Sequence, residues 1–341
     1  MKICIVAGAR PNFVKIAPIV WAVDKRRAEG AKMEYEMVYA GCTDDPTLEP
    51  SLFSDLQIPR PQTYLGVDSA GLNELTGSVM SAFEKYLKEA DPDVVIVVDD
   101  LASTMAVAIV TKKAGVLLAH LVAGTRSFDI SMPKEINRLV IDGLSDLLFT
   151  AGVNSNSIVS REGAENEKVY MVGNILMDCL RRNRNRFVRP AALEKHHIGD
   201  GNYFVLTLNR KALLSNRKNL KRLLEHLVHS AEQIPIVAPL RDSARSVVAE
   251  LLPTETNLFL VSPMSYLEFG YLIQHAKCIV TDSGNVSEEA TFDGVPCITL
   301  NSYTEHMETV SVGTNVLVGE DADRLSMALE QIVAGDRKSV V

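Results

Sequence analysis

The sequence lacks several features that would place the protein in a specialised class. None of its apolar runs reaches the roughly 18 residues of a membrane-spanning helix. Because the first predicted strand begins at Lys2, we expect no signal peptide before it. The formal net charge of −8 is opposite to the basic excess of a nucleic-acid binder. We therefore expect neither a membrane nor a nucleic acid as partner, although a few local cations could hold the phosphate of a small ligand.

Cysteine is scarce and is not arranged for disulfides or metals. The five cysteines are odd in number and far apart. Cys4, Cys278 and Cys297 lie in strand-like apolar runs, which is typical of buried thiols in a reducing compartment. None of the seven histidines forms HExxH or a similar metal pattern. These observations predict a cytoplasmic protein with no metal and no cofactor.

The chain does contain an alternation of short β-branched runs with longer helix-period segments. Its 341 residues, 47% hydrophobic and 23% charged, are enough for two globular domains. Continuous apolar strands separated by helices are typical of parallel sheets covered on both faces. The pattern restarts near Tyr203. The predicted strands cover 2–6, 93–98, 117–122, 147–150, 169–172, 203–206, 234–238, 258–261, 278–281, 297–300 and 315–318.

We therefore predict an α/β fold with two doubly wound, Rossmann-like domains facing across a cleft. The domains cover 1–177 and 202–341, and an interdomain linker covers 178–201. The linker contains a basic run at 181–186, which is more typical of a solvated helix face than of a phosphate or partner site. Because doubly wound sheets bind ligands at the carboxyl ends of their strands, the loops after strands are the places to look for chemistry.

Charged residues follow three strands of the first predicted domain. After the first strand, Arg10 and Lys15 lie near the start of a helix, which is a natural anion site. The alternative is an ordinary turn with surface cations. Asp100 follows the strand at 93–98, and Glu135 and Arg138 open a later helix. Acidic groups at strand ends could transfer protons, although such residues are more often helix caps or surface ion pairs.

The segment from Thr281 to Glu289 is the strongest local signal. It follows an apolar run, and Asp282 or Ser283 can cap the next helix. Ser283 and Gly284 would present backbone N–H groups to a diphosphate. Glu288 or Glu289 could chelate the hydroxyls of a ribose. The alternative is a capped helix with a solvated acidic face.

Seven motifs, in the same order along almost the whole chain, resemble those of the non-hydrolysing UDP-N-acetylglucosamine 2-epimerases. Gly8-Ala9-Arg10-Pro11 with Lys15 and Pro18 is similar to GTRPE-x-x-K-x-x-P. The segment from Thr281 to Ala290 is similar to TDSGG-x-QEEA. The other similarities are those of Asp100–Thr104 to GDTTST, Ala123–Ser127 to the end of HVEAGLRT, Glu135–Arg138 to PEExNR, Gly173-Asn174 with Asp178 to GNT-x-x-D, and Thr304-Glu305 with Glu308 to TERPE.

This resemblance implies the two-domain glycosyltransferase-B type of fold, usually as a homodimer, with a UDP-sugar bound between the domains. It also implies epimerisation at C2 by elimination of UDP and its re-addition. The residues it assigns to catalysis are Asp100, Glu135 and Arg138. The residues it assigns to substrate binding are Arg10, Lys15, Arg210, Phe269, Ser283, Gly284, Glu288, Glu289 and His306.

Several positions depart from the family motifs, and these departures fall on the chemistry. The departing residues are Val122 for the glutamate of HVEAG, Lys134 for the first glutamate of PEExNR, Asn209 for the histidine of HRREN, Gly41-Cys42-Thr43 for the Gly-Gln-His after the second strand, and His306 for the arginine of TERPE. A valine cannot transfer a proton, and an asparagine is a poor acid or base. Glu135 or His306 is an alternative acid–base group.

Three functions are therefore consistent with the sequence. The first is an active 2-epimerase of a UDP-N-acetylhexosamine, with Asp100 as the acid–base group most easily carried over. The second is a catalytically silent UDP-sugar-binding paralogue, which could pair with an intact epimerase and regulate it. The third is a sugar transferase or hydrolase that uses the same cleft, an idea that rests on analogy of fold alone.

Overall fold

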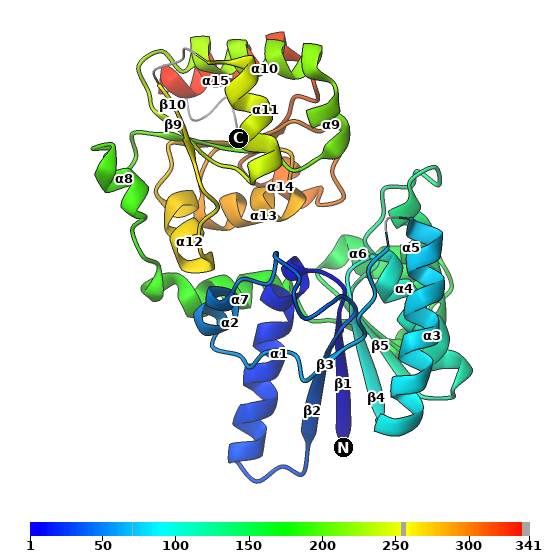
Figure 1. Ribbon diagram of the computed structural model, residues 1–341. Helices are drawn as coiled ribbons and strands as arrows, with labels where there is room; N and C mark the ends of the chain where they lie inside the picture. The colour runs from blue at the N-terminus through cyan, green and yellow to red at the C-terminus, as the bar shows by residue number, and fades with distance from the viewer. Residues whose placement is uncertain (70, 254–256, 336–341) are drawn as a thin grey trace. The chain divides into compact units, whose positions relative to one another are not determined.

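A computed structural model describes residues 1–69, 71–253 and 257–335 of the chain (Figure 1). The chain divides into two compact units, Met1–Arg182 and Asn183–Val341. None of the helices in the described ranges is both long and apolar enough to cross a bilayer. Each unit is built on one parallel sheet with helices between its strands, so each can be described by itself.

The first unit contains a seven-stranded parallel sheet in the order β3-β2-β1-β4-β5-β6-β7. Its strands are β1 Lys2–Ala7, β2 Glu34–Tyr39, β3 Thr63–Tyr64, β4 Val94–Val98, β5 Leu117–Ala123, β6 Leu147–Thr150 and β7 Val169–Met171. Its helices are α1 Arg10–Ala28, α2 Pro50–Leu56, α3 Leu72–Ala90, α4 Ala102–Lys113, α5 Pro133–Leu144, α6 Val153–Arg161 and the short η1 Asn166–Lys168, followed by α7 Ile175–Asn183.

The second unit contains a six-stranded parallel sheet in the order β10-β9-β8-β11-β12-β13. Its strands are β8 Phe204–Thr207, β9 Ile236–Pro239, β10 Leu258–Val261, β11 Cys278–Thr281, β12 Cys297–Thr299 and β13 Asn315–Leu317. Its helices are η2 Arg184–Arg186, α8 Ala191–Lys195, α9 Lys211–Ser215, α10 Arg217–Ser230, α11 Asp242–Leu251, α12 Tyr266–Gln274, α13 Gly284–Asp293, α14 Glu308–Ser311 and α15 Ala322–Val333.

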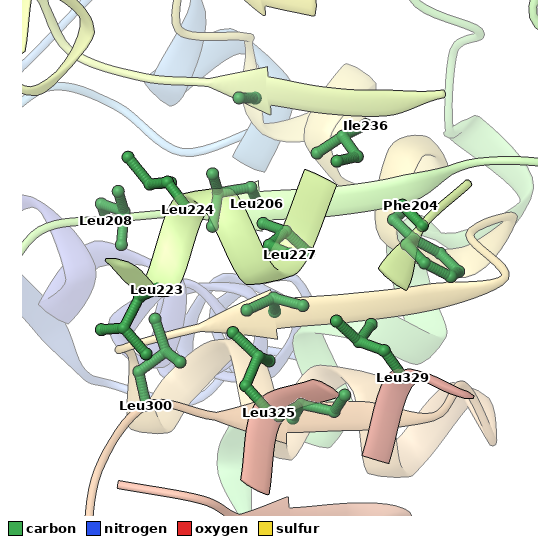
Figure 2. Close-up of a cluster of buried hydrophobic side chains, with 14 of the residues drawn as sticks. Phe204, Leu206, Leu208, Leu223, Leu224, Leu227, Ile236, Leu300, Leu325 and Leu329 are labelled. Carbon is green, nitrogen blue, oxygen red and sulfur yellow. The ribbon is translucent and has the colours of Figure 1, made fainter. Parts of the chain in front are cut away.

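Each unit has its own apolar core. In the first, valines of β4 and helix residues such as Phe83 are buried against the sheet. In the second, α10 places leucines at helical spacing on its inner face, where they meet leucines of α15 beside β8 (Figure 2). Leu223, Leu227 and Leu329 in this cluster are almost completely buried. Burial of such side chains, at roughly 25 cal/mol per Å² of apolar surface, is the main force that holds each sheet to its helices.

The predicted fold class of two doubly wound parallel sheets is confirmed, and the predicted strands lie within two residues of those observed. The prediction gave no range for β2 or β3. Edge strand β3 pairs only with the last two residues of β2, Val38 and Tyr39. The first half of β2 therefore has a neighbouring strand on one side only, and it can contain the charged residues Glu34 and Glu36. These glutamates interrupt the continuous apolar run that is typical of a buried parallel strand.

Both sheets place their reversal of strand order between the first and fourth strands of the unit. In the first unit β1 lies between β2 and β4, and in the second β8 lies between β9 and β11. The loops that follow such a pair of strands diverge to opposite faces, and ligands of doubly wound folds bind there. The loops after β1, β4, β8 and β11, together with the helices α1 and α13 that follow two of them, carry most of the site residues that the sequence predicts.

Candidate functional site

The loops after β1 and β4 are joined by polar contacts around Asp99. Asn12 donates from Nδ2 to Asp99 Oδ2 at 2.8 Å, and Lys15 Nζ lies 2.6 Å from Asp99 Oδ1. A Cβ added to Gly8 would lie 2.1 Å from Ser103 Oγ, so glycine is needed for this close approach to α4. The two loops at this switch point therefore hold one another in place.

The two cations that the sequence predicts as anion ligands each pair with a carboxylate of the same unit. Arg10 donates from Nε to both carboxylate oxygens of Glu49, at 3.0 and 3.2 Å, and from Nη2 to Oε1 at 2.5 Å. Lys15 is buried beside Asp99. A phosphate bound here would have to share these cations with the carboxylates. The anion-binding role of Arg10 and Lys15 therefore stays a prediction.

Asp100 follows β4 and is held by two cations of α5. Arg138 donates from Nε and Nη2 to Asp100 Oδ2, at 2.8 and 2.6 Å, and Lys134 Nζ lies 3.3 Å from Oδ1. Burial alone would raise the pKa of Asp100, but Lys134 and Arg138 outweigh it and hold the pKa below its usual value. Asp100 is therefore a carboxylate at neutral pH, and its role as an acid–base group stays a prediction.

Glu135 lies in the first turn of α5, and four donors surround its carboxylate. Oε2 accepts bonds from the backbone N–H and the hydroxyl of Ser127 and from Arg138 Nη1, each at 2.9 Å, and Oε1 accepts from the N–H of Phe128 at 2.9 Å. The residue is only 2% exposed. Although burial raises the pKa, these hydrogen bonds outweigh it and lower the pKa. This geometry favours anchoring of the loop at 127–128 over proton transfer, for which Glu135 stays a prediction.

A buried triad beside Asp100 was not among the predicted site residues. His120 Nδ1 lies 2.6 Å from Asp142 Oδ1, and His120 Nε2 lies 3.1 Å from the carbonyl oxygen of Asp99. Asp142 Oδ2 lies 2.7 Å from Arg126 Nη2 and accepts the N–H of Gly124 at 3.0 Å. The triad links β5 to the loop after β4. One feature of the sequence could have indicated Asp142: it follows Glu135 and Arg138 at the spacing that places all three on one face of a helix.

Three residues other than glycine adopt a left-handed backbone around these loops. They are Asp99 with φ of 61°, Val122 with φ of 72° and Phe128 with φ of 60°. This conformation is unfavourable for a side chain branched at Cβ, and such strain costs on the order of 1–3 kcal/mol per residue. It persists where the surroundings over-determine the backbone, which here means the polar contacts of Asp142 and Glu135.

In the second unit, Asp282 ties the loop after β11 to the loop after β8. Its carboxylate accepts the backbone N–H of Asn209, at 3.0 and 2.8 Å to the two oxygens, and that of Arg210 at 2.7 Å. The sequence offered Asp282 as a cap of α13, and that interpretation is wrong, because its oxygens face the neighbouring loop. Thr207 and Thr281, at the ends of the two strands, also bond to each other at 2.6 Å.

Among the described residues, no side chain caps the N-terminus of α13. Ser283 occupies the N-cap position, but its side chain makes no capping bond, and the first turn contains no acidic residue. An α-helix begins with N–H groups that have no partner inside the helix, and these carry a partial positive charge. The end of α13 therefore presents Gly284 and its neighbours as donors for an anion.

His306 lies against the start of α13, where it meets two glutamates. A Cβ added to Gly284 would lie 3.5 Å from His306 Cδ2. His306 Nδ1 lies 3.2 Å from Glu288 Oε1 and 3.8 Å from Glu308 Oε1. Glu288 is 4% exposed and Glu289 is 9% exposed, so the alternative of a solvated acidic face is wrong. Potential ligand atoms of Glu288, His306 and Glu308 all lie within 4.8 Å of one another.

The remaining predicted residues of this unit lie around the same strand ends. Arg210 donates from Nη2 to the carbonyl of Leu300 at 2.7 Å and to Glu320 Oε1 at 3.1 Å. Phe269 lies on α12, half-buried against an apolar cluster of the unit. The structure thus brings Ser283, Gly284, Glu288 and His306 together, whereas Arg210 joins them through its backbone bond to Asp282. The binding roles of all these residues stay predictions.

Comparison with known proteins identifies what this arrangement is similar to. A family model described as UDP-N-acetylglucosamine 2-epimerase matches residues 25–340. The UDP-N-acetylglucosamine 2-epimerase of Methanocaldococcus jannaschii is 34% identical over 97% of this chain and 92% of its own length. The UDP-2,3-diacetamido-2,3-dideoxy-D-glucuronate 2-epimerase of Pseudomonas aeruginosa is 33% identical over 95% of this chain and 90% of its own length.

Solved structures give the same result. The crystal structure of the M. jannaschii enzyme in complex with UDP-GlcNAc and UDP superposes with a TM-score of 0.88 at 32% identity, covering 99% of this chain and 94% of that chain. The lipopolysaccharide outer core galactosyltransferase WaaB matches with a TM-score of 0.56 at 16% identity, covering 99% of this chain and 92% of that chain, which shows likeness of fold alone.

Proposed function

The chain belongs to the UDP-N-acetylglucosamine 2-epimerase family, and we propose that it binds a UDP-N-acetylhexosamine and inverts the configuration at C2 of the sugar. The observation that carries the proposal is the N-terminus of α13, where Ser283 makes no capping bond and no acid lies in the first turn. Such a terminus suits a diphosphate. In the second turn of the same helix lie Glu288 and Glu289, one of which is proposed to contact the ribose.

The proposed reaction removes the C2 proton as the bond between C1 and the diphosphate oxygen breaks. The electron pair of the C–H bond forms the C1–C2 double bond, and the pair of the C1–O bond leaves with UDP. Re-addition reverses both changes with the proton returned to the other face. We assign the base to Asp100, because Arg138 and Lys134 keep its carboxylate ionised.

Inversion also needs a group that delivers a proton to the second face. We propose that Lys134 is that group, because its ammonium can donate a proton and its side chain is 61% exposed, although in this structure the ammonium pairs with Asp100 Oδ1 at 3.3 Å. Lys134 then replaces a glutamate of the family motif, as Val122 and Asn209 replace other ionisable groups. Arg138, bonded to both Asp100 and Glu135, positions the base.

A catalytically silent binder is the second candidate, and Val122 favours it. This valine stands where the family motif carries a glutamate, and a hydrocarbon side chain cannot exchange a proton. Such a protein would keep the nucleotide seat of α13 and lose the C2 chemistry. It could then act beside an intact paralogue.

Proton exchange at C2 separates the two candidates. Purified protein is incubated with UDP-N-acetylglucosamine in D2O, and the C2 proton signal is followed by NMR while calorimetry measures UDP binding. We expect loss of the signal, and we expect Asp100→Asn to abolish that loss while it keeps UDP binding. UDP binding without exchange would establish the silent binder. Release of free UDP together with retention of the C2 proton would indicate transfer or hydrolysis instead.

The seat at α13 is tested by Ser283→Asp. A carboxylate at the N-cap would bond to the free N–H groups and repel the diphosphate. Like charges about 4 Å apart near a protein surface repel by about 4 kcal/mol at most, so a loss of UDP affinity of at least about tenfold, or ~1.4 kcal/mol, is expected. The stability of the second unit should stay the same or rise by about 0.5–1 kcal/mol.

Ser265→Asp is the matched control for this variant. Ser265 is the N-cap of α12, and its side chain already accepts the N–H of Glu268 at 3.3 Å. The substitution adds the same charge to a helix that has its cap, so UDP affinity should not change. Equal UDP affinity in Ser283→Asp and the unmodified chain would place the diphosphate elsewhere.

Three further parts of the proposal concern organisation. We propose domains at 1–177 and 202–341 with a linker at 178–201, a homodimer that could also pair with an intact paralogue, and a cytoplasmic location. The location is proposed because Cys4, Cys278 and Cys297 are buried thiols far apart in the sequence, which is typical of proteins in a reducing compartment. Sedimentation analysis, alone and with an intact epimerase chain, measures the assembly.

A further inference from the structure

Glu288, His306 and Glu308 converge from two segments of the second unit. Glu288 lies in the second turn of α13, His306 lies in the loop before α14, and Glu308 is the first residue of α14. The sequence shows no metal-ligand spacing here, because α13 and the following strand separate the first residue from the other two. Tertiary packing brings Glu288 to the other two, which are two residues apart in the chain.

The distances between these three side chains suit a single cation. Bonds of about 2.0–2.2 Å from a metal to nitrogen and oxygen allow two ligand atoms to lie up to about 4.3 Å apart, and about 3.4 Å apart in a tetrahedral site. His306 Nδ1 lies 3.2 Å from Glu288 Oε1 and 3.8 Å from Glu308 Oε1. All three donor atoms lie within 4.8 Å of one another, so a small rotation of the exposed Glu308 side chain completes the set.

The charge at this position also suits a cation. An imidazole nitrogen carries at most one proton, and that proton can be shared with only one of the two carboxylates at a time. A divalent ion bound to the Nδ1 lone pair interacts with both carboxylates at once. From these distances and charges, we propose that Glu288, His306 and Glu308 form a binding site for a divalent transition-metal cation such as Mn2+ or Zn2+.

The ligand types indicate which ions the site takes. Carboxylate oxygens suit Mn2+ and other hard ions, whereas imidazole suits Zn2+ and other later transition metals. A mixed set of one imidazole and two carboxylates lies between these classes and disfavours Mg2+ and Ca2+, which prefer oxygen ligands alone. Side-chain exposure rises from 4% at Glu288 through 17% at His306 to 53% at Glu308, so the cation would be open to solvent on one side.

The proposed cation site lies one imidazole ring away from the proposed diphosphate seat, because Nδ1 of His306 faces the two glutamates and the Cδ2–Nε2 edge of the same ring faces Gly284. The imidazole of His306 lies against Gly284, the first residue of α13. A cation held there could complete its coordination with a diphosphate oxygen, as metal ions do in many nucleotide sites. This second step rests on the proposed function, whereas the cation site itself does not. The bound cation would raise the affinity for UDP without any further side chain at the helix terminus.

The cation site is tested first without nucleotide. The untagged full-length chain is titrated with Mn2+ and free Mn2+ is followed by electron paramagnetic resonance, and calorimetry with Zn2+ repeats the measurement. We expect one saturable site per chain, weakened at least tenfold by His306→Asn and by Glu308→Gln. The side chain of Glu308 is half exposed, so its conservative variant should fold normally even if His306→Asn does not.

His226→Asn is the matched control. His226 Nδ1 lies 4.0 Å from Asp323 Oδ1 and 3.0 Å from Ser326 Oγ in the same unit, so it is a histidine beside one carboxylate rather than two. Its removal should leave Mn2+ and Zn2+ binding unchanged. No saturable binding of either ion to the unmodified chain, or binding weakened by His226→Asn but not by the other two variants, would overturn the cation site.

UDP titrations with and without Mn2+ then test the link to the nucleotide. We expect Mn2+ to raise UDP affinity at least fivefold in the unmodified chain and to have no effect in Glu308→Gln. Equal UDP affinity with and without Mn2+ would overturn the contact between cation and diphosphate. Saturable Mn2+ binding together with no UDP binding would support the cation site and overturn the nucleotide function, so the two failures can be told apart.

Discussion

The two units share a strand order but hold their switch-point loops in different ways. In the first unit, side-chain ion pairs fix the loop after β4: Lys15 of α1 pairs with Asp99, and Arg138 of α5 pairs with Asp100. In the second unit, the loops after β8 and β11 are fixed by backbone N–H groups that bond to Asp282. The first arrangement positions charged side chains, and the second leaves a helix terminus open to an anion.

This difference shows that one topology can serve two tasks. A buried pair of charges must be desolvated, so it adds little stability, but removing one partner leaves an uncompensated charge. The first unit contains such ion pairs at Asp100, Asp142 and Asp99. Residues with a left-handed backbone lie around the same loops. In the described part of the second unit, the left-handed residues other than glycine are His197 and Glu232, away from the loops after β8 and β11.

The largest effect should come from Arg138→Met, which breaks the ionic network of the first unit. The substitution leaves Asp100 with Lys134 alone and removes one donor from Glu135, both of them buried or nearly so. Loss of one partner of a buried pair costs about 3–5 kcal/mol. The sole tryptophan, Trp21, lies in this unit, so its fluorescence during urea unfolding measures the effect there.

An exposed ion pair of the second unit serves as the control for that variant. Arg217 Nη1 lies 2.8 Å from Glu250 Oε2, with side chains that are 47% and 70% exposed. Arg217→Met should change stability by less than about 1 kcal/mol, because solvent screens such a pair. Hydrogen exchange read by mass spectrometry follows both units in one sample. A loss below about 1 kcal/mol in Arg138→Met would mean that the network does not hold the first unit together.

Low pH should also destabilise the first unit more than the second. The folded pKa values of Asp100, Glu135 and Asp142 are all lowered, because their hydrogen bonds and neighbouring cations outweigh burial. A lowered folded pKa contributes stability that is present above the unfolded pKa, about 4, and is lost as the pH falls through the folded value. We expect urea midpoints from Trp21 to change little between pH 7 and 5 and to fall below about pH 4.

The second unit should lose less over the same range. Burial raises the pKa of Asp293, so its contribution has the opposite sign: it is present below the unfolded pKa and lost as the pH rises through the folded value. Asp200 and Glu308 have lowered pKa values, but their side chains are 42% and 53% exposed and screened by solvent. If hydrogen exchange shows that the second unit opens first in acid, the contrast between the units is wrong.

The fold was predictable because it depends on local patterns that recur along the chain. Apolar runs between helix-period segments indicated the doubly wound sheets, and strand ends indicated where charged loops gather. Strand β2 was not predicted because Glu34 and Glu36 interrupt its apolar pattern. Strand β3 was not predicted because two residues are too few to form a pattern. The order of strands, which brings the loops after β1 and β4 together, is a property of tertiary packing and does not appear in any one segment.

Candidate site residues could be named from the sequence, but their bonding partners could not. Asp100, Glu135 and Arg138 were named from the sequence, yet the donors that occupy Glu135 include the backbone of Ser127 and Phe128, which no side-chain motif reveals. Asp142 was missed because its partner His120 lies on a different element. Glu288 and His306 were each named, but their contact depends on how α14 packs.

The smallest effect should come from relief of backbone strain at Val122, by Val122→Gly. At φ of 72°, a side chain branched at Cβ is in an unfavourable conformation that glycine adopts freely. Val122 is half-buried, so the lost contacts offset part of the gain. We expect the first unit to be stabilised by about 1 kcal/mol, which is a rise in Tm of roughly 2–4 °C for a unit of this size. Urea unfolding followed by Trp21 fluorescence measures it.

Val94→Gly is the matched control for Val122→Gly, and it should change the stability in the opposite direction. Val94 is also half-buried, but it lies in β4 with regular pairing to Ile3 and Leu117, so glycine there only adds backbone entropy to the unfolded chain and removes contacts. That change should destabilise the unit by about 0.5–1 kcal/mol or slightly more. Opposite signs for the two valines would show that the first unit stores strain beside Asp100. Equal destabilisation would mean that the contacts of Val122, and not the polar anchors around it, determine its conformation.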